Sequence, residues 1–216
     1  MTIALDRSVG FLVDELKKQG LYENTLIIFT NDNGAATYLE TNNAGMRGRK
    51  GTVWEGGIRV PFFMTWPGKI PGGQKDSSLV STLDIASTFC SIAGYSPGEM
   101  KELQLTGMDL LMSSDSQDRE LPLFWKRGNM AAVRKGPWKL ILLNDNPAFL
   151  LDLSKDPLEK VNQIAIYPDK VQELQSEFNT WKDKNPEPIW IKTSWNVYAQ
   201  NVLKYWDQEN SNNIIE

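Results

Sequence analysis

The chain has no histidine and a single cysteine among its 216 residues. The lack of histidine removes the commonest general base, every Ser-His or Cys-His nucleophile pair and the usual histidine-containing zinc sites. One cysteine excludes an internal disulfide and a cysteine metal cluster, and it leaves the redox compartment open. Any chemistry carried by these residues therefore relies on carboxylate, amide and lysine side chains.

A long apolar run and a surplus of basic residues are also lacking. No apolar stretch approaches the roughly 20 residues that cross a bilayer, so no membrane span is predicted. The formal net charge of −4 does not favour DNA or RNA binding, which relies on basic residues that release counterions. Residues 1–7 lack the basic start and apolar segment of a secretory signal, so either the chain is cytosolic or its true start is missing.

What is present predicts a globular protein of one or two compact units, with 41% hydrophobic and 23% charged residues. Residues 3–19 show helical periodicity and end at Gly20. The apolar run 25–30 lacks alternation, which is typical of a strand in a parallel sheet covered on both faces by helices. Residues 60–65 predict another short strand, and a helix is expected after a capping-box signature at residues 81–84, with one apolar face formed by Ile85, Phe89 and Ile92.

The composition changes after a segment rich in Ser, Gly, Asp and Pro, residues 95–120, where we place a boundary. Short apolar runs separated by turn residues predict an antiparallel meander over 121–125, 130–134, 138–143 and 149–153. A helix marked by Val171, Leu174, Phe178 and Trp181 is expected to cover one face of it. The predicted units are an α/β part (1–115), a small four-stranded antiparallel α+β subdomain (116–184) and an aromatic-rich arm (185–216). We expect the arm to cover exposed core rather than to stack on sugars.

The most informative motif is Asp32-Asn33-Gly34, which ends the first predicted strand and precedes a glycine-rich loop that carries Lys50. Open α/β sheets place ligands at the carboxyl ends of their strands, so the two adjacent oxygen donors predict a metal site followed by a cationic clamp. The alternatives are a tight turn at Asn33-Gly34 and a solvated cation at Lys50. The loop is not a Walker A motif, because Gly51 follows Lys50 where that motif has Ser or Thr.

Other residues near this motif carry weaker expectations. Arg47, Arg49 and Arg59 are expected either to contact an anion or to pair with Glu55. The glycine-rich loop also contains Trp54, for which packing is favoured over substrate stacking. The lone thiol, Cys90, lies in an apolar helical stretch, where a cysteine usually behaves as a small hydrophobe rather than a nucleophile.

Residues 24–34 and 46–61 closely resemble the type I sulfatases, the formylglycine-dependent, arylsulfatase-like sulfuric ester hydrolases. Residues 81–88, 107–110, 132–140 and 151–157 resemble later landmarks of that family in the same order. The resemblance implies an α/β fold with an alkaline-phosphatase/sulfatase-like mixed sheet, here incomplete, followed by a small antiparallel α+β subdomain. It also implies that Asp32 and Asn33 bind a divalent cation, usually Ca²⁺, and that Lys50 is a catalytic, sulfate-binding lysine.

The resemblance covers only the second half of the family's active site. The formylglycine motif reads Cys or Ser, any residue, Pro or Ala, any residue, Arg, and the sequence at 90–94, Cys-Ser-Ile-Ala-Gly, lacks the arginine. The family's Asp-Asp metal pair and active-site histidines have no counterparts either. The resemblance therefore implies that the chain is the carboxy-terminal portion of a sulfatase and is nearly inactive alone. Its expected partners are a missing amino-terminal half and an aryl or carbohydrate sulfate ester as substrate.

The same resemblance implies that the intact parent is periplasmic, secreted or lysosome-like. Two alternative functions stay open at this point. One is a non-catalytic remnant that binds a cation or sulfate. The other is a phosphate or phosphonate ester hydrolase of the same superfamily.

Overall fold

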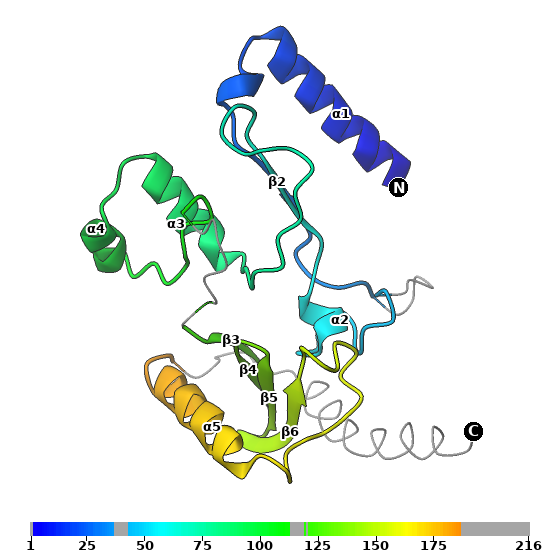
Figure 1. Ribbon diagram of the computed structural model, residues 1–216, viewed down its shortest axis with the longest axis vertical. Helices are drawn as coiled ribbons and strands as arrows, with labels where there is room; N and C mark the ends of the chain where they lie inside the picture. The colour runs from blue at the N-terminus through cyan, green and yellow to red at the C-terminus, as the bar shows by residue number, and fades with distance from the viewer. Residues whose placement is uncertain (1, 37–42, 113–118, 120, 187–216) are drawn as a thin grey trace.

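The computed structural model describes residues 2–36, 43–112, 119 and 121–186; helices and short strands intermix in its first part, and four consecutive strands and a final helix follow (Figure 1). In chain order they are α1 (Thr2–Lys18), η1 (Tyr22–Asn24), β1 (Ile27–Thr30), α2 (Glu55–Ile58), β2 (Phe62–Thr65), α3 (Leu83–Ile92), α4 (Pro97–Glu102), β3 (Leu123–Arg127), β4 (Met130–Lys135), β5 (Trp138–Leu143), β6 (Asn146–Asp152) and α5 (Pro168–Asp183). The mixed α/β class is confirmed. The predicted limits of the three units stay predictions, and the arm lies almost wholly outside the described residues.

The opening helix α1 begins and ends close to the predicted positions. Gly20 follows it with φ +70°, a backbone conformation that glycine adopts at helix ends without strain. The helix buries none of its residues. Several of its large apolar side chains are exposed to solvent, and Phe11 is 73% exposed. Among the helices of the described residues, none has the length and apolarity that a membrane span requires.

Strand β1 pairs with β2 in antiparallel register, from Ile27 opposite Thr65 to Thr30 opposite Phe62. The predicted strands exist, but the expectation that β1 is a parallel strand covered on both faces is wrong in this pairing. All residues of β1 are only partly buried. A continuous apolar run indicates that a strand is suited to a buried environment. Whether the strand is parallel or antiparallel to its neighbour depends on which segment of the chain pairs with it.

The carboxy-terminal strands form a four-stranded antiparallel sheet in the order β3-β4-β5-β6, which confirms the predicted meander. Asn144 and Asp145 connect β5 to β6 with φ values of +51° and +59°, as the common two-residue hairpin turn requires. Helix α5 covers one face of this sheet, where Leu174 and Phe178 pack against Leu140 and its neighbours. Figure 1 shows this helix alongside the sheet, with α2 on the side toward the rest of the chain.

The second face of this sheet is covered by the glycine-rich loop. Val53 and Trp54 from the loop join a buried cluster with Ile141 and Phe149 from the sheet. Both faces of β5 are therefore buried, which explains why its sequence is a continuous apolar run and not an alternating one. The subdomain and the loop share one core.

Helix α3 begins near its predicted start, and Asp84 accepts a hydrogen bond from the Ser81 amide at 2.7 Å. Its buried residues are polar, whereas Phe89 and Ile92 of its predicted apolar face are exposed. The short helix α4 was not predicted. Its capping box, in which Ser96 and Glu99 exchange hydrogen bonds, was visible in the sequence as Ser-Pro-Gly-Glu. It lies in the segment 95–120, where the boundary between two units was placed.

Candidate active site

The structure brings together the two segments that carry the predicted site residues of this chain. Asp32-Asn33-Gly34 follows β1, and the Gly34 amide donates a hydrogen bond to the Gly57 carbonyl at 3.0 Å. The Lys50 amide donates to the Ala35 carbonyl at 3.1 Å. Backbone hydrogen bonds therefore hold the Asp32 segment against the Lys50 loop.

Glycine is required where these two segments touch. A Cβ atom placed on Gly34 would lie 1.8 Å from the Gly56 carbonyl oxygen in the loop. Within the loop itself, a Cβ atom on Gly57 would lie 2.4 Å from the Thr52 carbonyl oxygen. Both distances are far shorter than a carbon–oxygen contact permits. The absence of a side chain at these positions lets one backbone pack directly on another.

The side chains of Asp32 and Lys50 are exposed, and that of Asn33 is half-buried. None of the three makes a hydrogen bond or ion pair with the described residues. Two adjacent, unengaged oxygen donors fit part of a calcium ligand set, since Ca²⁺ takes six to eight oxygens. Within the described ranges, no group of three or more His, Cys, Asp or Glu side chains forms a metal site, so further ligands are needed.

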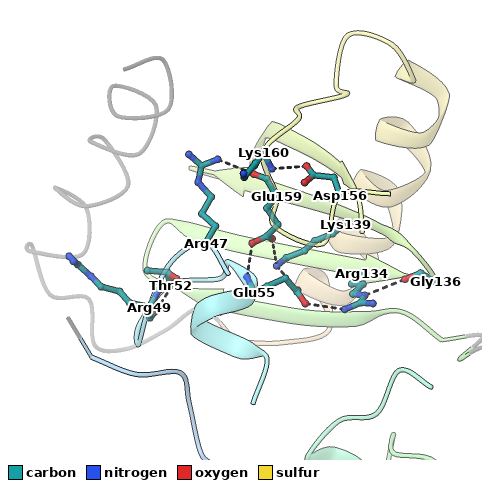
Figure 2. A network of polar contacts seen from close by, with 10 residues as sticks. All are labelled: Arg47, Arg49, Thr52, Glu55, Arg134, Gly136, Lys139, Asp156, Glu159 and Lys160. Atoms are coloured by element: carbon teal, nitrogen blue, oxygen red, sulfur yellow. Dashed lines mark hydrogen bonds and ion pairs between the residues drawn. The ribbon is translucent and has the colours of Figure 1, made fainter. Parts of the chain in front are cut away.

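A buried network of charged residues lies beneath the loop, as Figure 2 shows. The Lys139 ammonium contacts Glu55 Oε1 at 2.9 Å and Glu159 Oε1 at 2.8 Å, and all three side chains are almost completely buried. Arg134 contributes a second cation, with its guanidinium 3.4 Å from Glu55 Oε2. The network joins the start of α2 to the sheet and to the segment after β6.

The two carboxylates of this network differ in acidity. Burial opposes the ionisation of Glu55, but the charges of Lys139 and Arg134 together with the Lys139 hydrogen bond outweigh it, so the pKa of Glu55 lies below its usual value. Burial raises the pKa of Glu159, and attraction to Lys139 offsets this only in part. The difference follows from Arg134, which contacts Glu55 directly and strengthens the preference of that carboxyl for the charged form.

The arginines of the loop have varied surroundings. Arg47 donates from a guanidinium nitrogen to the Glu159 carbonyl at 2.9 Å and lies over the Trp54 ring. Arg59 lies close enough for its charge to favour ionised Glu55, although Lys139 and Arg134 are that carboxylate's ion-pair partners. Arg49 is exposed. Anion contacts by these three arginines stay predictions.

Two other expectations concern Trp54 and Cys90. Trp54 is 2% exposed and its ring centroid lies 5.2 Å from that of Phe149, so its packing role is confirmed. Cys90 is a free thiol on α3 and is partly rather than fully buried.

Sequence reasoning missed the residues of the buried network that come from the subdomain. Lys139 interrupts an otherwise apolar run, Trp-Lys-Leu-Ile-Leu-Leu over 138–143, and a lysine there signals either an exposed position or a buried ion pair. Glu159 lies in an irregular segment and has no pattern that predicts its burial. Arg127, at the end of β3, was also missed, and it donates to the Gly51 carbonyl next to Lys50.

Comparison with known proteins gives a consistent set of relatives. The sulfatase family model matches residues 4–95. N-acetylgalactosamine-6-sulfatase of Mus musculus is 38% identical over 62% of this chain and 27% of its own length. A sulfatase of Formosa agariphila is 32% identical over 87% of this chain and 40% of its own length. The chain therefore spans less than half the length of these curated relatives.

Solved structures agree with the sequence matches. The structure of Ps i-CgsB in complex with k-i-k-neocarrahexaose superposes with a TM-score of 0.80 and 30% identity, over 97% of this chain and 48% of that one. A phosphonate monoester hydrolase of Agrobacterium radiobacter superposes with a TM-score of 0.58 and 21% identity, over 85% of this chain and 40% of that one. At that lower identity the likeness shows the fold alone.

Proposed function

The chain belongs to the sulfatase family, and from this premise we propose that it is the carboxy-terminal portion of a hydrolase of sulfate esters. Its part is to supply two metal ligands, Asp32 and Asn33, and a sulfate-binding lysine, Lys50. The observation that carries the proposal is the joining of these residues by the Gly34–Gly57 and Lys50–Ala35 backbone hydrogen bonds. An oxygen-donor pair and a fixed cation on one backbone framework are suited to a divalent cation and an anion bound side by side.

Each residue has a role that follows from its chemistry. Asp32 and Asn33 would hold Ca²⁺ with a carboxylate and an amide oxygen, in a set completed by ligands from elsewhere. When bound, the cation supplies polarisation of a sulfate oxygen. The ammonium of Lys50 would neutralise charge that develops on the sulfate group as the S–O bond breaks.

The nucleophile is proposed to lie outside this sequence. Cys90 does not fit a formylglycine precursor, because the arginine of that motif is absent and the thiol is partly buried on a helix. Without a covalent nucleophile the remaining groups cannot replace the displacement route, so the chain alone is expected to be nearly inactive.

A carbohydrate sulfate is the substrate class that the relatives favour. The mouse relative is an N-acetylgalactosamine-6-sulfatase, and the structure with 30% identity was solved with a neocarrahexaose. We propose a sulfated sugar for this protein over a simple aryl sulfate. Its compartment is proposed to be the periplasm, the exterior or a lysosome-like organelle.

An amino-terminal half is proposed to cover the exposed apolar surface of α1, β2 and α3. The chain aligns with only 40% of the Formosa relative, and Phe11, Phe63 and Phe89 are all exposed. Large apolar side chains gathered on several elements usually mark a surface that another segment covers. The missing half of the active site would come with this segment.

The experiment that tests the proposal begins with the DNA upstream of the Met1 codon, translated in all frames and searched for the formylglycine motif and an Asp-Asp pair. The protein from the complete reading frame is then assayed with 6-sulfated N-acetylgalactosamine, aryl sulfate and aryl phosphate, with and without Ca²⁺. Lys50→Ala is expected to lower kcat/KM for the sulfate esters by about 10²–10³-fold. Lys101→Ala, at an exposed lysine on α4, is the matched control and should have no effect.

The outcomes separate the alternatives. Absence of sulfate ester hydrolysis under every metal condition rejects the proposal, and preference for the phosphate would move the protein to the phosphate or phosphonate ester hydrolases. A non-catalytic binding protein is tested by calcium titration of the chain itself beside Asp32→Ala. Identical heats from the two proteins would reject cation binding at this position.

A further inference from the structure

The buried network beneath the loop connects three separate parts of the chain through one lysine. Lys139 lies on β5 in the middle of the subdomain sheet, and its side chain is completely buried. Its ammonium lies between Glu55 of the loop region and Glu159 of the segment after β6, at 2.9 and 2.8 Å. A single cation therefore joins the subdomain sheet to the predicted active-site loop.

Glu159 contacts that loop on both sides of Lys50, once through a backbone amide and once through an arginine side chain. Its Oε2 atom accepts a hydrogen bond from the Glu55 amide at 2.7 Å. Its carbonyl accepts one from the Arg47 guanidinium at 2.9 Å, and the Arg47 carbonyl in turn accepts from the Gly56 amide at 2.6 Å. Figure 2 shows the contacts of Glu159 with Glu55 and with Arg47. Lys50 lies in the sequence between the two points at which Glu159 contacts the chain.

Burying these charged side chains carries a desolvation cost that an apolar core would not have. Charges taken out of water lose several kcal/mol of solvation each, and apolar residues of similar volume often stabilise a fold as well or better. The same charges demand a particular geometry, because a lysine between two carboxylates is satisfied only when both lie within hydrogen-bond distance. Because the buried charges are satisfied in only one arrangement, they can hold a loop in a single position.

We infer that Lys139 and Glu159 are positioning residues for Lys50, through which the carboxy-terminal subdomain fixes the sulfate-binding loop. The inference rests on the proposed role of Lys50 as the sulfate-binding cation. It assigns the subdomain a part in the reaction although Lys139 and Glu159 are too deeply buried to touch a substrate.

The test uses three variants of the full chain. Glu159→Gln keeps an oxygen that can accept from the Glu55 amide but removes the charge that pairs with Lys139. Lys139→Met removes the shared cation. Lys135→Met is the matched control, because Lys135 lies on the neighbouring strand and pairs with Glu173 and Glu177 of α5, away from the loop. Sodium sulfate is titrated into each protein while backbone amide signals are followed by NMR, and amide hydrogen exchange is measured without sulfate.

Sulfate is expected to shift the Lys50 and Gly51 amide signals in the unmodified chain. Glu159→Gln should weaken this binding by about tenfold and speed exchange of the Lys50 and Thr52 amides by about tenfold, while amides that pair β3 with β4 keep their exchange rates. Lys139→Met should show larger effects of the same kind. Lys135→Met should leave both the sulfate affinity and the loop exchange unchanged.

Unchanged sulfate binding and unchanged loop exchange in Glu159→Gln would overturn the inference. So would a rise in exchange that is equal in the loop and in the β3–β4 pairing, since that reports only a less stable fold. If Lys139→Met does not fold, the result for Glu159→Gln alone decides whether the inference stands. A lack of sulfate-induced shifts in the unmodified chain, with Lys50→Ala behaving identically, would reject the proposed function instead, and the exchange rates would still decide the positioning role.

Discussion

The amino-terminal residues 2–112 and the subdomain of β3–β6 with α5 bury different kinds of side chain. In the described residues, both apolar clusters form on the subdomain sheet, one beneath α5 and one beneath the glycine-rich loop. In the amino-terminal part, large apolar residues of α1, β2 and α3 face solvent instead. The subdomain sheet is covered by α5 on one face and by the glycine-rich loop on the other, whereas the rest of the amino-terminal part has apolar surface that needs another partner.

The helices α3 and α5 show the same contrast at smaller scale. The buried residues of α5 are Leu174 and Phe178, which pack on the sheet. The buried residues of α3 include Asp84, whose carboxylate pairs with Arg119 and accepts from the Met108 amide. Apolar packing holds α5, and a polar network connects α3 to the segment that follows it.

The largest effect is expected from expression of the chain alone. Exposed apolar residues such as Phe11 and Phe63, together with the short two-stranded pairing of β1 with β2, predict self-association or partial folding. Analytical ultracentrifugation over a range of concentrations measures this directly. A monomer that melts in one cooperative transition would contradict the contrast between the two regions, and Phe11→Ser is expected to reduce self-association while Lys101→Ser leaves it unchanged.

The same substitution in the two regions sharpens the comparison. Phe178→Ala removes a completely buried ring and is expected to lower the free energy of unfolding by about 3–5 kcal/mol. Phe11→Ala removes a ring that is 73% exposed, and the expected change is within about 0.5 kcal/mol. Urea unfolding followed by tryptophan fluorescence measures both. Equal losses would show that α1 is packed in solution.

A pair of glycine substitutions tests the contact that assembles the site. Gly34→Ala places a Cβ 1.8 Å from the Gly56 carbonyl oxygen, and overpacking of this kind costs about 1–3 kcal/mol. Gly10→Ala meets no atom within 4 Å and is expected to stabilise α1 by about 0.5–1 kcal/mol. Exchange of the amides that donate across this contact, those of position 34 and Lys50, should rise only in Gly34→Ala. Protection that persists there would argue against direct backbone packing.

The smallest expected effect is a pH dependence with opposite signs at the two buried carboxylates. The pKa of Glu55 is lowered in the folded protein by Lys139 and Arg134 despite its burial, so the stability it contributes is present above the unfolded value of about 4.3 and is lost as the pH falls through the folded value. The pKa of Glu159 is raised, chiefly by burial. Its contribution is therefore complete below about 4.3 and is lost as the pH rises through the higher folded value.

Urea unfolding at a series of pH values separates these two contributions. Glu55→Gln should flatten the loss of stability on the acid side, and Glu159→Gln should flatten the loss that begins near pH 4.3 and continues upward. Lys135→Met serves as a control for general loss of charge. Identical pH profiles for the two glutamine variants would show that the carboxylates titrate as an equivalent pair.

Much of the fold was predictable because local patterns report local structure. Strand β5 was predicted with its observed limits, and α5 was predicted from the periodicity of four apolar residues that all lie on it. The pairing of β1 was not, because an apolar run carries no information about the direction of its neighbour. Of the site, Asp32, Asn33 and Lys50 came from motif and resemblance, whereas Glu159 had no sequence signal at all.

The sequence by itself determined the element types, the meander of the subdomain and the absence of imidazole and paired-thiol chemistry. These features depend on short-range spacing and on which side chains exist. Only the tertiary structure decided that Gly34 packs on Gly56 and that Lys139 joins Glu55 to Glu159 across 84 and 20 residues of sequence. Such contacts depend on how distant backbone segments meet, and a buried charge is tolerated only where that meeting supplies its partners.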